Sequence, residues 1–92
     1  MARQMPEAGE IRRIVREMIF DVLQKKRSRF KLEDVKEGAS LTRDLGIDSL
    51  DILQMTAICE KKFQLKLPDE ESQSLDELGS IVKTIVKHWP QS

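Results

Sequence analysis

Several residue types that carry chemistry are scarce in this 92-residue chain, which has one cysteine, one histidine, one tryptophan and no tyrosine. The single cysteine, Cys59, excludes an intrachain disulfide and favours a reducing compartment. No apolar run approaches the roughly 20 residues that span a bilayer, and residues 1–10 lack the apolar core of a secretory signal. We therefore expect a cytoplasmic protein that does not insert into membranes.

Charge is balanced over the whole chain but not locally. Residues 1–31 hold nine Lys/Arg against four acids, whereas residues 32–92 hold seven against twelve. The basic stretch 25–31 would suit nucleic acid, but it contains one aromatic side chain and no recognisable binding fold surrounds it. We interpret it as a solvated helix end and loop, with cations near a helix C-terminus, and expect no nucleic-acid partner.

Two amphipathic helices are predicted in the first two thirds of the chain. The first runs from Pro6 to Gln24, with apolar side chains at the i, i+3, i+4 and i+7 spacing. The second runs from Ser49 to Phe63, and Asp48 can cap it by accepting a bond from a backbone N–H of the first turn. A long loop between them should pack across the bundle through its apolar residues Leu32, Val35, Leu41, Leu45 and Ile47.

A third helix is predicted from Leu75 to Trp89, where Ser74-x-x-Glu77 fits a capping box. A short helical turn near Asp69–Gln73 would bridge the second and third helices. The prediction is thus an all-α domain of residues 1–92, in which residues 1–8 form a flexible terminus.

The second helix carries two apolar stripes rather than one when its residues are placed at about 100° intervals. One stripe is Ile52, Met55, Cys59 and Phe63, and the other is Leu50, Leu53 and Ala57. Such a helix is either central to the bundle or lends one stripe to a ligand or partner.

Catalysis finds little support among the side chains. A nucleophilic serine needs a base within reach, and the single histidine, His88, lies at the far end of the last helix. The carboxylates Asp44, Asp48 and Asp51 lack the ligand spacing of a calcium loop, and Cys59 has no metal-ligand companion. We expect neither an enzyme nor a structural or catalytic metal.

Ser49 has a structural and a functional interpretation. A serine after an aspartate at a helix start usually only helps to begin the helix. Here, however, Asp48 takes the cap position, Gly46 leaves the approach open, and the helix N-terminus favours an attached anionic group.

The segment DLGIDSLD, residues 44–51, resembles that of the acyl carrier proteins of fatty acid and polyketide synthesis. An amphipathic helix and a long loop precede it, and an apolar helix ending in F-x-L-x-L-P-D-E follows, so the resemblance covers about residues 10–89. It implies a small four-helix bundle with three main helices and a short third helix. It also implies that a separate magnesium-dependent transferase esterifies Ser49 with phosphopantetheine taken from coenzyme A. The thiol of this arm would hold acyl groups as thioesters, which removes the need for catalytic residues.

The same resemblance assigns neighbouring residues. Asp48 and Leu50 flank the attachment serine. An acyl pocket would be lined by Leu53, Leu67, Leu75 and Ile81, although core packing explains these four equally well. Partner enzymes would dock on residues of the second helix and the loop before it, namely Asp44, Asp51, Gln54, Ala57, Glu60 and Lys61. Gln54, Lys61 and Lys62 stand where acids are common in the family.

These features predict a monomeric acyl carrier of fatty acid, polyketide or related lipid metabolism. Its partners would be a phosphopantetheinyl transferase and acyl-loading ligase or synthase enzymes. The lysines favour a specialised role over a housekeeping one. An aminoacyl or peptidyl carrier, and a carrier-like interaction subunit without the arm, stay open as alternatives.

Overall fold

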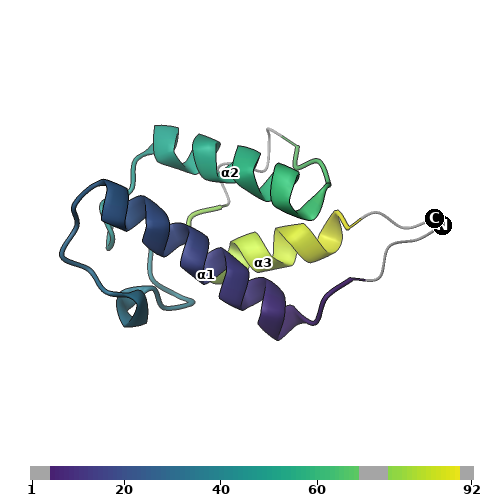
Figure 1. Cartoon of the computed structure of the whole chain (residues 1–92), viewed down its shortest axis with the longest axis horizontal. Helices are drawn as coiled ribbons and strands as arrows, with labels where there is room; N and C mark the ends of the chain where they lie inside the picture. Colours follow the sequence, from purple (N-terminus) through teal and green to yellow (C-terminus); the bar gives the residue numbers. More distant parts are fainter. Residues whose placement is uncertain (1–4, 69–74, 90–92) are drawn as a thin grey trace.

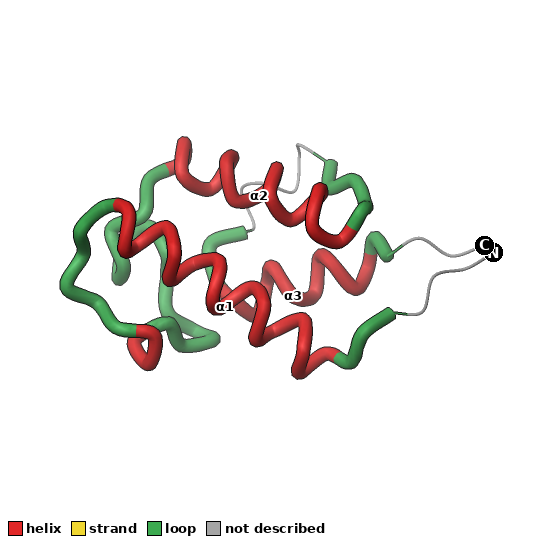
Figure 2. Tube along the Cα trace, viewed as in Figure 1, coloured by secondary structure: helices red, strands yellow, loops and turns green. Residues whose placement is uncertain are grey.

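The computed structural model describes residues 5–68 and 75–89 and is all-α over these ranges (Figure 1). The α-helices are α1 (Ala8–Lys25), α2 (Ser49–Phe63) and α3 (Leu78–Lys87), and a short 3-10 turn, η1, spans Leu32–Asp34. Figure 2 shows that helices and connecting loops account for the whole described trace. The all-α prediction is confirmed, and the turn expected at Asp69–Gln73 lies outside the described residues.

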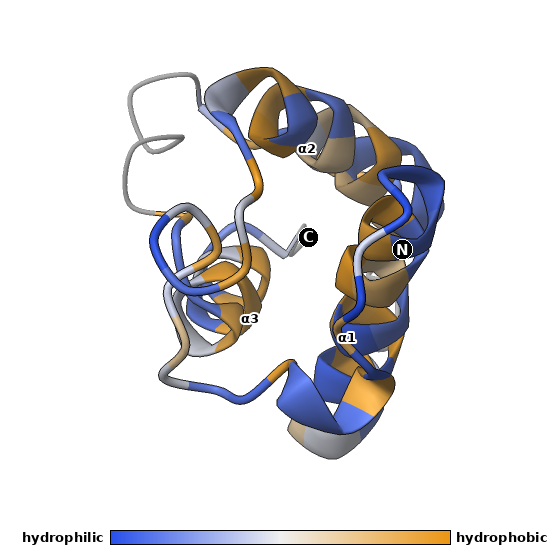
Figure 3. Ribbon diagram, turned by 90° about the vertical axis from the view of Figure 1, so that its left-hand side faces the viewer, coloured by the Kyte–Doolittle hydropathy of each residue, from blue (hydrophilic) through white to orange (hydrophobic). Residues whose placement is uncertain are grey.

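The three helices enclose one apolar core. α1 packs against both α2 and α3, and Figure 3 shows the apolar faces of α1 and α3 turned toward each other. At one end of the bundle the rings of Phe63 and Trp89 meet edge to face, with centroids 6.1 Å apart. The periodic positions of the helices supply most of the core: Ile11, Val15, Met18, Ile19, Leu23, Ile52, Met55, Cys59, Phe63, Leu78, Ile81, Val82 and Ile85.

The bounds of α2 agree with the prediction, whereas those of α3 do not. α3 begins at Leu78, three residues after the predicted start. Glu77 is the N-cap residue, and its backbone is in the extended conformation. The reason is a tertiary contact, because the Asp76 carbonyl accepts a 2.7 Å hydrogen bond from the Leu41 N–H and holds this segment outside the helix. Leu75 is nevertheless buried, as expected.

The loop between α1 and α2 packs across the bundle as predicted, with one exception. Val35, Leu41, Leu45 and Ile47 are buried, but Leu32, in η1, is exposed. The Leu32 prediction was therefore wrong, because an apolar side chain alone does not determine which way a turn faces.

Asp76 holds the loop to the start of α3. Its carboxylate accepts hydrogen bonds from the Ser40 hydroxyl, the Thr42 hydroxyl (2.9 Å) and the Thr42 N–H (3.0 Å). Partial burial raises the pKa of Asp76, but these bonds outweigh burial and hold the pKa below its usual value. These bonds thus fix the part of the loop around Ser40 and Thr42, which precedes α2, to the segment before α3.

Candidate functional site

Ser49 is the first residue of α2, and its side chain is exposed. The chain reaches it through Gly46, whose φ of 71° lies in the left-handed region that favours glycine. Ile47 then enters the core, and its N–H donates to the Leu41 carbonyl at 2.8 Å. A buried residue two positions earlier therefore anchors the backbone that presents Ser49 to solvent.

A reciprocal pair of hydrogen bonds begins α2. The Asp51 N–H donates to Asp48 Oδ1 at 2.9 Å, and the Asp48 N–H donates to Asp51 Oδ2 at 3.3 Å. Asp48 is thus the N-cap residue, as the sequence predicted. Within the described residues, the Ser49 hydroxyl takes part in none of the hydrogen bonds, so Asp48 leaves it available for another role.

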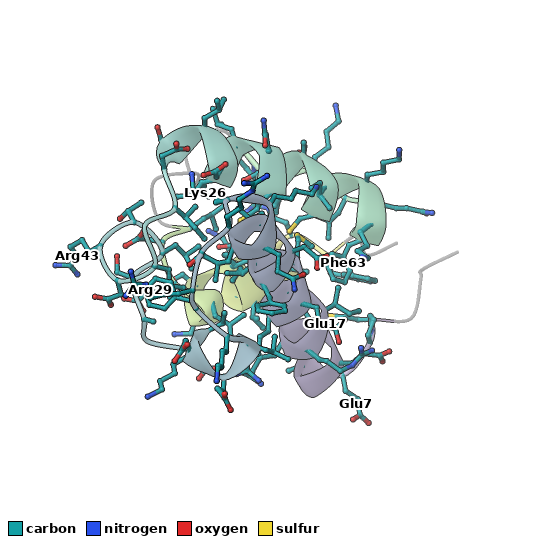
Figure 4. All side chains as sticks on the ribbon, turned by 60° about the vertical axis from the view of Figure 1, so that its left-hand side comes forward. Glu7, Glu17, Lys26, Arg29, Arg43 and Phe63 are labelled. Atoms are coloured by element: carbon teal, nitrogen blue, oxygen red, sulfur yellow. The ribbon has the colours of Figure 1, made fainter. Side chains whose placement is uncertain are left out.

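Lys26 is a member of this site that the sequence did not reveal. Its Nζ lies 2.8 Å from Asp51 Oδ2 and 3.7 Å from Asp48 Oδ2. Figure 1 shows the reason, because α1 ends at the same end of the bundle at which α2 begins, and Figure 4 shows Lys26 beside the first turn of α2. The hydrogen bond from Lys26 lowers the pKa of Asp51, and the same bond raises the pKa of Lys26.

The acids predicted for partner docking have structural contacts of their own. Asp44 Oδ2 accepts the Ser40 N–H at 2.8 Å, and Glu60 Oε2 accepts the Leu67 N–H at 2.8 Å. Asp51 is paired with Lys26. Part of the negative charge expected for docking therefore stabilises turns and helix ends.

The second apolar stripe of α2 faces solvent. Leu50 is 62% exposed and Leu53 is 54% exposed, and Ala57 is exposed as well. Lys61, also exposed, lies one helical turn beyond Ala57 on the same face. The distance along the helix axis from residue 50 to residue 61 is about 16 Å. The stripe starts beside Ser49 and ends at a cation.

A small apolar cavity lies between the three helices. Its lining includes Leu67, Leu75 and Ile81 of the predicted acyl pocket, together with Val15, Met18, Ile52, Met55, Thr56 and Cys59. Leu53 does not line the cavity and belongs to the exposed stripe instead. The cavity volume of about 10 Å³ has room for about one water molecule.

Cys59 belongs to this cavity and not to a reactive site. Its Sγ contacts Met18 Sδ at 3.5 Å, and burial raises the pKa of the thiol to about 12. A thiol with that pKa is a poor nucleophile at neutral pH.

The described ranges contain neither a metal-binding cluster nor a membrane-spanning helix. Residues 5–68 and 75–89 contain no group of three or more His, Cys, Asp or Glu side chains that could hold a metal ion. No helix within those ranges is long and apolar enough to cross a membrane.

Comparison with known proteins gives one family and a set of relatives. Residues 13–85 match the family described as "Phosphopantetheine attachment site". An acyl carrier protein of Wolinella succinogenes is 40% identical over 53 residues, which cover 58% of this chain and 70% of the relative. One from a Sulfurovum species is 34% identical over 53 residues, covering 58% and 71%. One from Clostridium acetobutylicum is 36% identical over 55 residues, covering 60% and 71%.

Proposed function

Since this chain is a member of the acyl carrier protein family, we propose that Ser49 is the residue to which phosphopantetheine is esterified. One observation carries the proposal: the Ser49 hydroxyl is exposed in the first turn of α2, while the neighbouring Asp48 supplies the cap. A serine needed only to start the helix would accept the backbone N–H that Asp48 accepts here.

The residues around Ser49 fit a phosphodiester-linked arm. The hydroxyl faces solvent, so a transferase can reach it, and the positive end of the helix dipole favours an anion there. When attached, the arm supplies a thiol that holds acyl groups as thioesters. The chain itself orients the serine, and as a member of the acyl carrier protein family it is a carrier and not an enzyme.

The cavity between the helices is our candidate for shielding the acyl chain. It is lined almost wholly by apolar side chains, which come from all three helices and from Leu67 and Leu75 outside them, and its volume of about 10 Å³ is too small for a chain of several carbons. Acyl binding therefore requires the helices to separate. The flexible, polarisable side chains of Met18 and Met55 suit a cavity that must change shape.

Partner enzymes are proposed to dock on the exposed stripe of α2, with Leu50 and Leu53 as apolar contacts. Lys61 and Lys62 are exposed and make no ion pair with the described residues. Carboxylates on a partner would complement these lysines, whereas a basic patch would be repelled. This charge pattern supports a specialised carrier of fatty acid, polyketide or related acyl metabolism.

Intact mass measurement tests the assignment of Ser49. The apo chain is incubated with coenzyme A, Mg²⁺ and a broad-specificity phosphopantetheinyl transferase, and we expect one added phosphopantetheine per chain. Ser49→Ala should gain none. Ser80→Ala is the matched control, because Ser80 also lies in the first turn of a helix, and it should be modified like the wild type. Modification of Ser49→Ala would contradict the assignment.

A further inference from the structure

Lys26 is placed at the start of α2 by the length of α1. It is the residue that follows α1, and its ammonium contacts the carboxylates of both Asp48, the residue before Ser49, and Asp51, the third residue of α2. A cation from one helix thus lies at the first turn of another, although 25 residues separate it from Asp51 in the sequence.

A phosphodiester on Ser49 would add a third negative charge to a turn that already carries two. Charges of the same sign within one helical turn repel, which disfavours the modified state. The helix N-terminus offers limited compensation, because Asp48 Oδ1 already accepts the Asp51 N–H and Asp51 Oδ2 already accepts the Asp48 N–H. The first turn therefore has two of its backbone donors occupied by carboxylates.

Lys26 can supply the missing positive charge. An ammonium has three donors, and only Asp51 takes a hydrogen bond from it among the described residues. The side chain is 34% exposed and has a flexible four-carbon stem, so its end can move toward solvent without leaving the site.

We propose that Lys26 is the counter-ion of the arm's phosphate, so that its ammonium is shared between Asp51 and the phosphodiester once Ser49 is modified. This inference rests on the proposed attachment to Ser49. It assigns a phosphate-binding role to the residue that caps the C-terminus of α1, in addition to the packing role of that helix. It also means that the stability of the folded protein depends more strongly on the contact between Lys26 and the start of α2 after modification than before it.

A comparison of apo and holo forms tests the proposal without a partner enzyme. Four proteins are prepared in both forms: the wild type, Lys26→Gln, Lys26→Arg and Lys25→Gln. Lys25 is the matched control, because it is the adjacent residue, has the same charge and makes no ion pair with the described residues. The holo forms are driven to completion with excess transferase and coenzyme A, and intact mass verifies them.

Two readouts are compared, the thermal midpoint and the ³¹P chemical shift of the phosphodiester. We expect attachment of the arm to lower the midpoint of Lys26→Gln by several degrees more than that of the wild type or Lys25→Gln. Lys26→Arg should behave like the wild type. The ³¹P shift should change in Lys26→Gln and not in Lys25→Gln, and the difference in midpoint should shrink in 1 M salt, where screening is strong.

The outcomes separate this inference from the proposed function. If all four proteins gain the arm but Lys26→Gln and Lys25→Gln respond alike in both readouts, Lys26 is not the counter-ion. If the wild type gains no arm, the attachment proposal fails first and this inference fails with it.

Discussion

Asp48 and Asp51 hold the first turn of α2 through each other's backbone, with the Asp51 N–H donating to Asp48 Oδ1 at 2.9 Å and the Asp48 N–H donating to Asp51 Oδ2 at 3.3 Å. This arrangement releases Ser49 from capping and fixes its position on the surface. The stability of the turn and the availability of Ser49 for modification are therefore linked.

Removal of the cap should destabilise the bundle. Asp48→Ala loses the acceptor for the Asp51 N–H, and we expect a loss of about 1 kcal/mol in the free energy of unfolding. Asp48→Asn keeps an oxygen acceptor and should retain most of the stability. Urea unfolding followed by circular dichroism measures both variants. Equal losses in the two would show that the charge of Asp48, and not its cap bond, matters.

Acidification should remove the contribution of the Lys26–Asp51 ion pair. Because Lys26 lowers the pKa of Asp51 below the ordinary 3.8, the stabilisation is fully present above pH 3.8 and is lost as the pH falls through the lowered value in the folded state. The thermal midpoint of Lys26→Gln should lie below that of the wild type at neutral pH, and the two midpoints should begin to converge as the pH falls below about 4. A gap that is unchanged down to pH 2 would contradict the pairing.

The two classes of thiol in the modified protein should differ sharply in reactivity. Burial raises the pKa of Cys59 to about 12, so the native apo protein should react slowly with a thiol reagent at pH 8 and completely in denaturant. The native holo protein should gain one fast-reacting thiol, that of the arm. A holo-level fast reaction in the apo protein would show that Cys59 is accessible.

The lysines at the end of α2 should set partner preference. The double variant Lys61→Glu/Lys62→Glu introduces acidic residues at two positions where acids are common in the family that the chain resembles. Its rate of acyl transfer with general fatty acid synthesis enzymes should rise several-fold, mainly through association, and the gain should fall with added salt. Lys83→Glu, which reverses an exposed charge on α3, is the control and should have little effect. A wild-type rate equal to that of an acidic housekeeping carrier would contradict the specialised role.

Local sequence signals were sufficient for some features and not for others. The start of α2 was predictable because Asp48 provides a cap within the segment itself, and the buried face of each helix follows its own periodicity. The start of α3 was not predictable, because Leu41, far away in the sequence, donates to the Asp76 carbonyl and competes with helix formation.

The composition of the site shows the same limit. Ser49 could be singled out from its neighbours in the chain, whereas Lys26 enters the site only after α1 packs beside α2. The family resemblance placed Leu53 in the acyl pocket, but the structure turns the apolar stripe that contains Leu53 outward, and Leu67, Leu75 and Ile81 line the cavity. Periodicity identifies a face but not the neighbour that covers it.

The position of the arm is the central claim, and tandem mass spectrometry of a tryptic digest measures it most directly. Cleavage after Arg43 and Lys61 releases residues 44–61, a peptide in which Ser49 is the only serine. We predict that phosphopantetheine is found on this peptide and that fragment ions place it on Ser49. Phosphopantetheine on any other residue, or its absence from fully transferase-treated protein, would contradict the account.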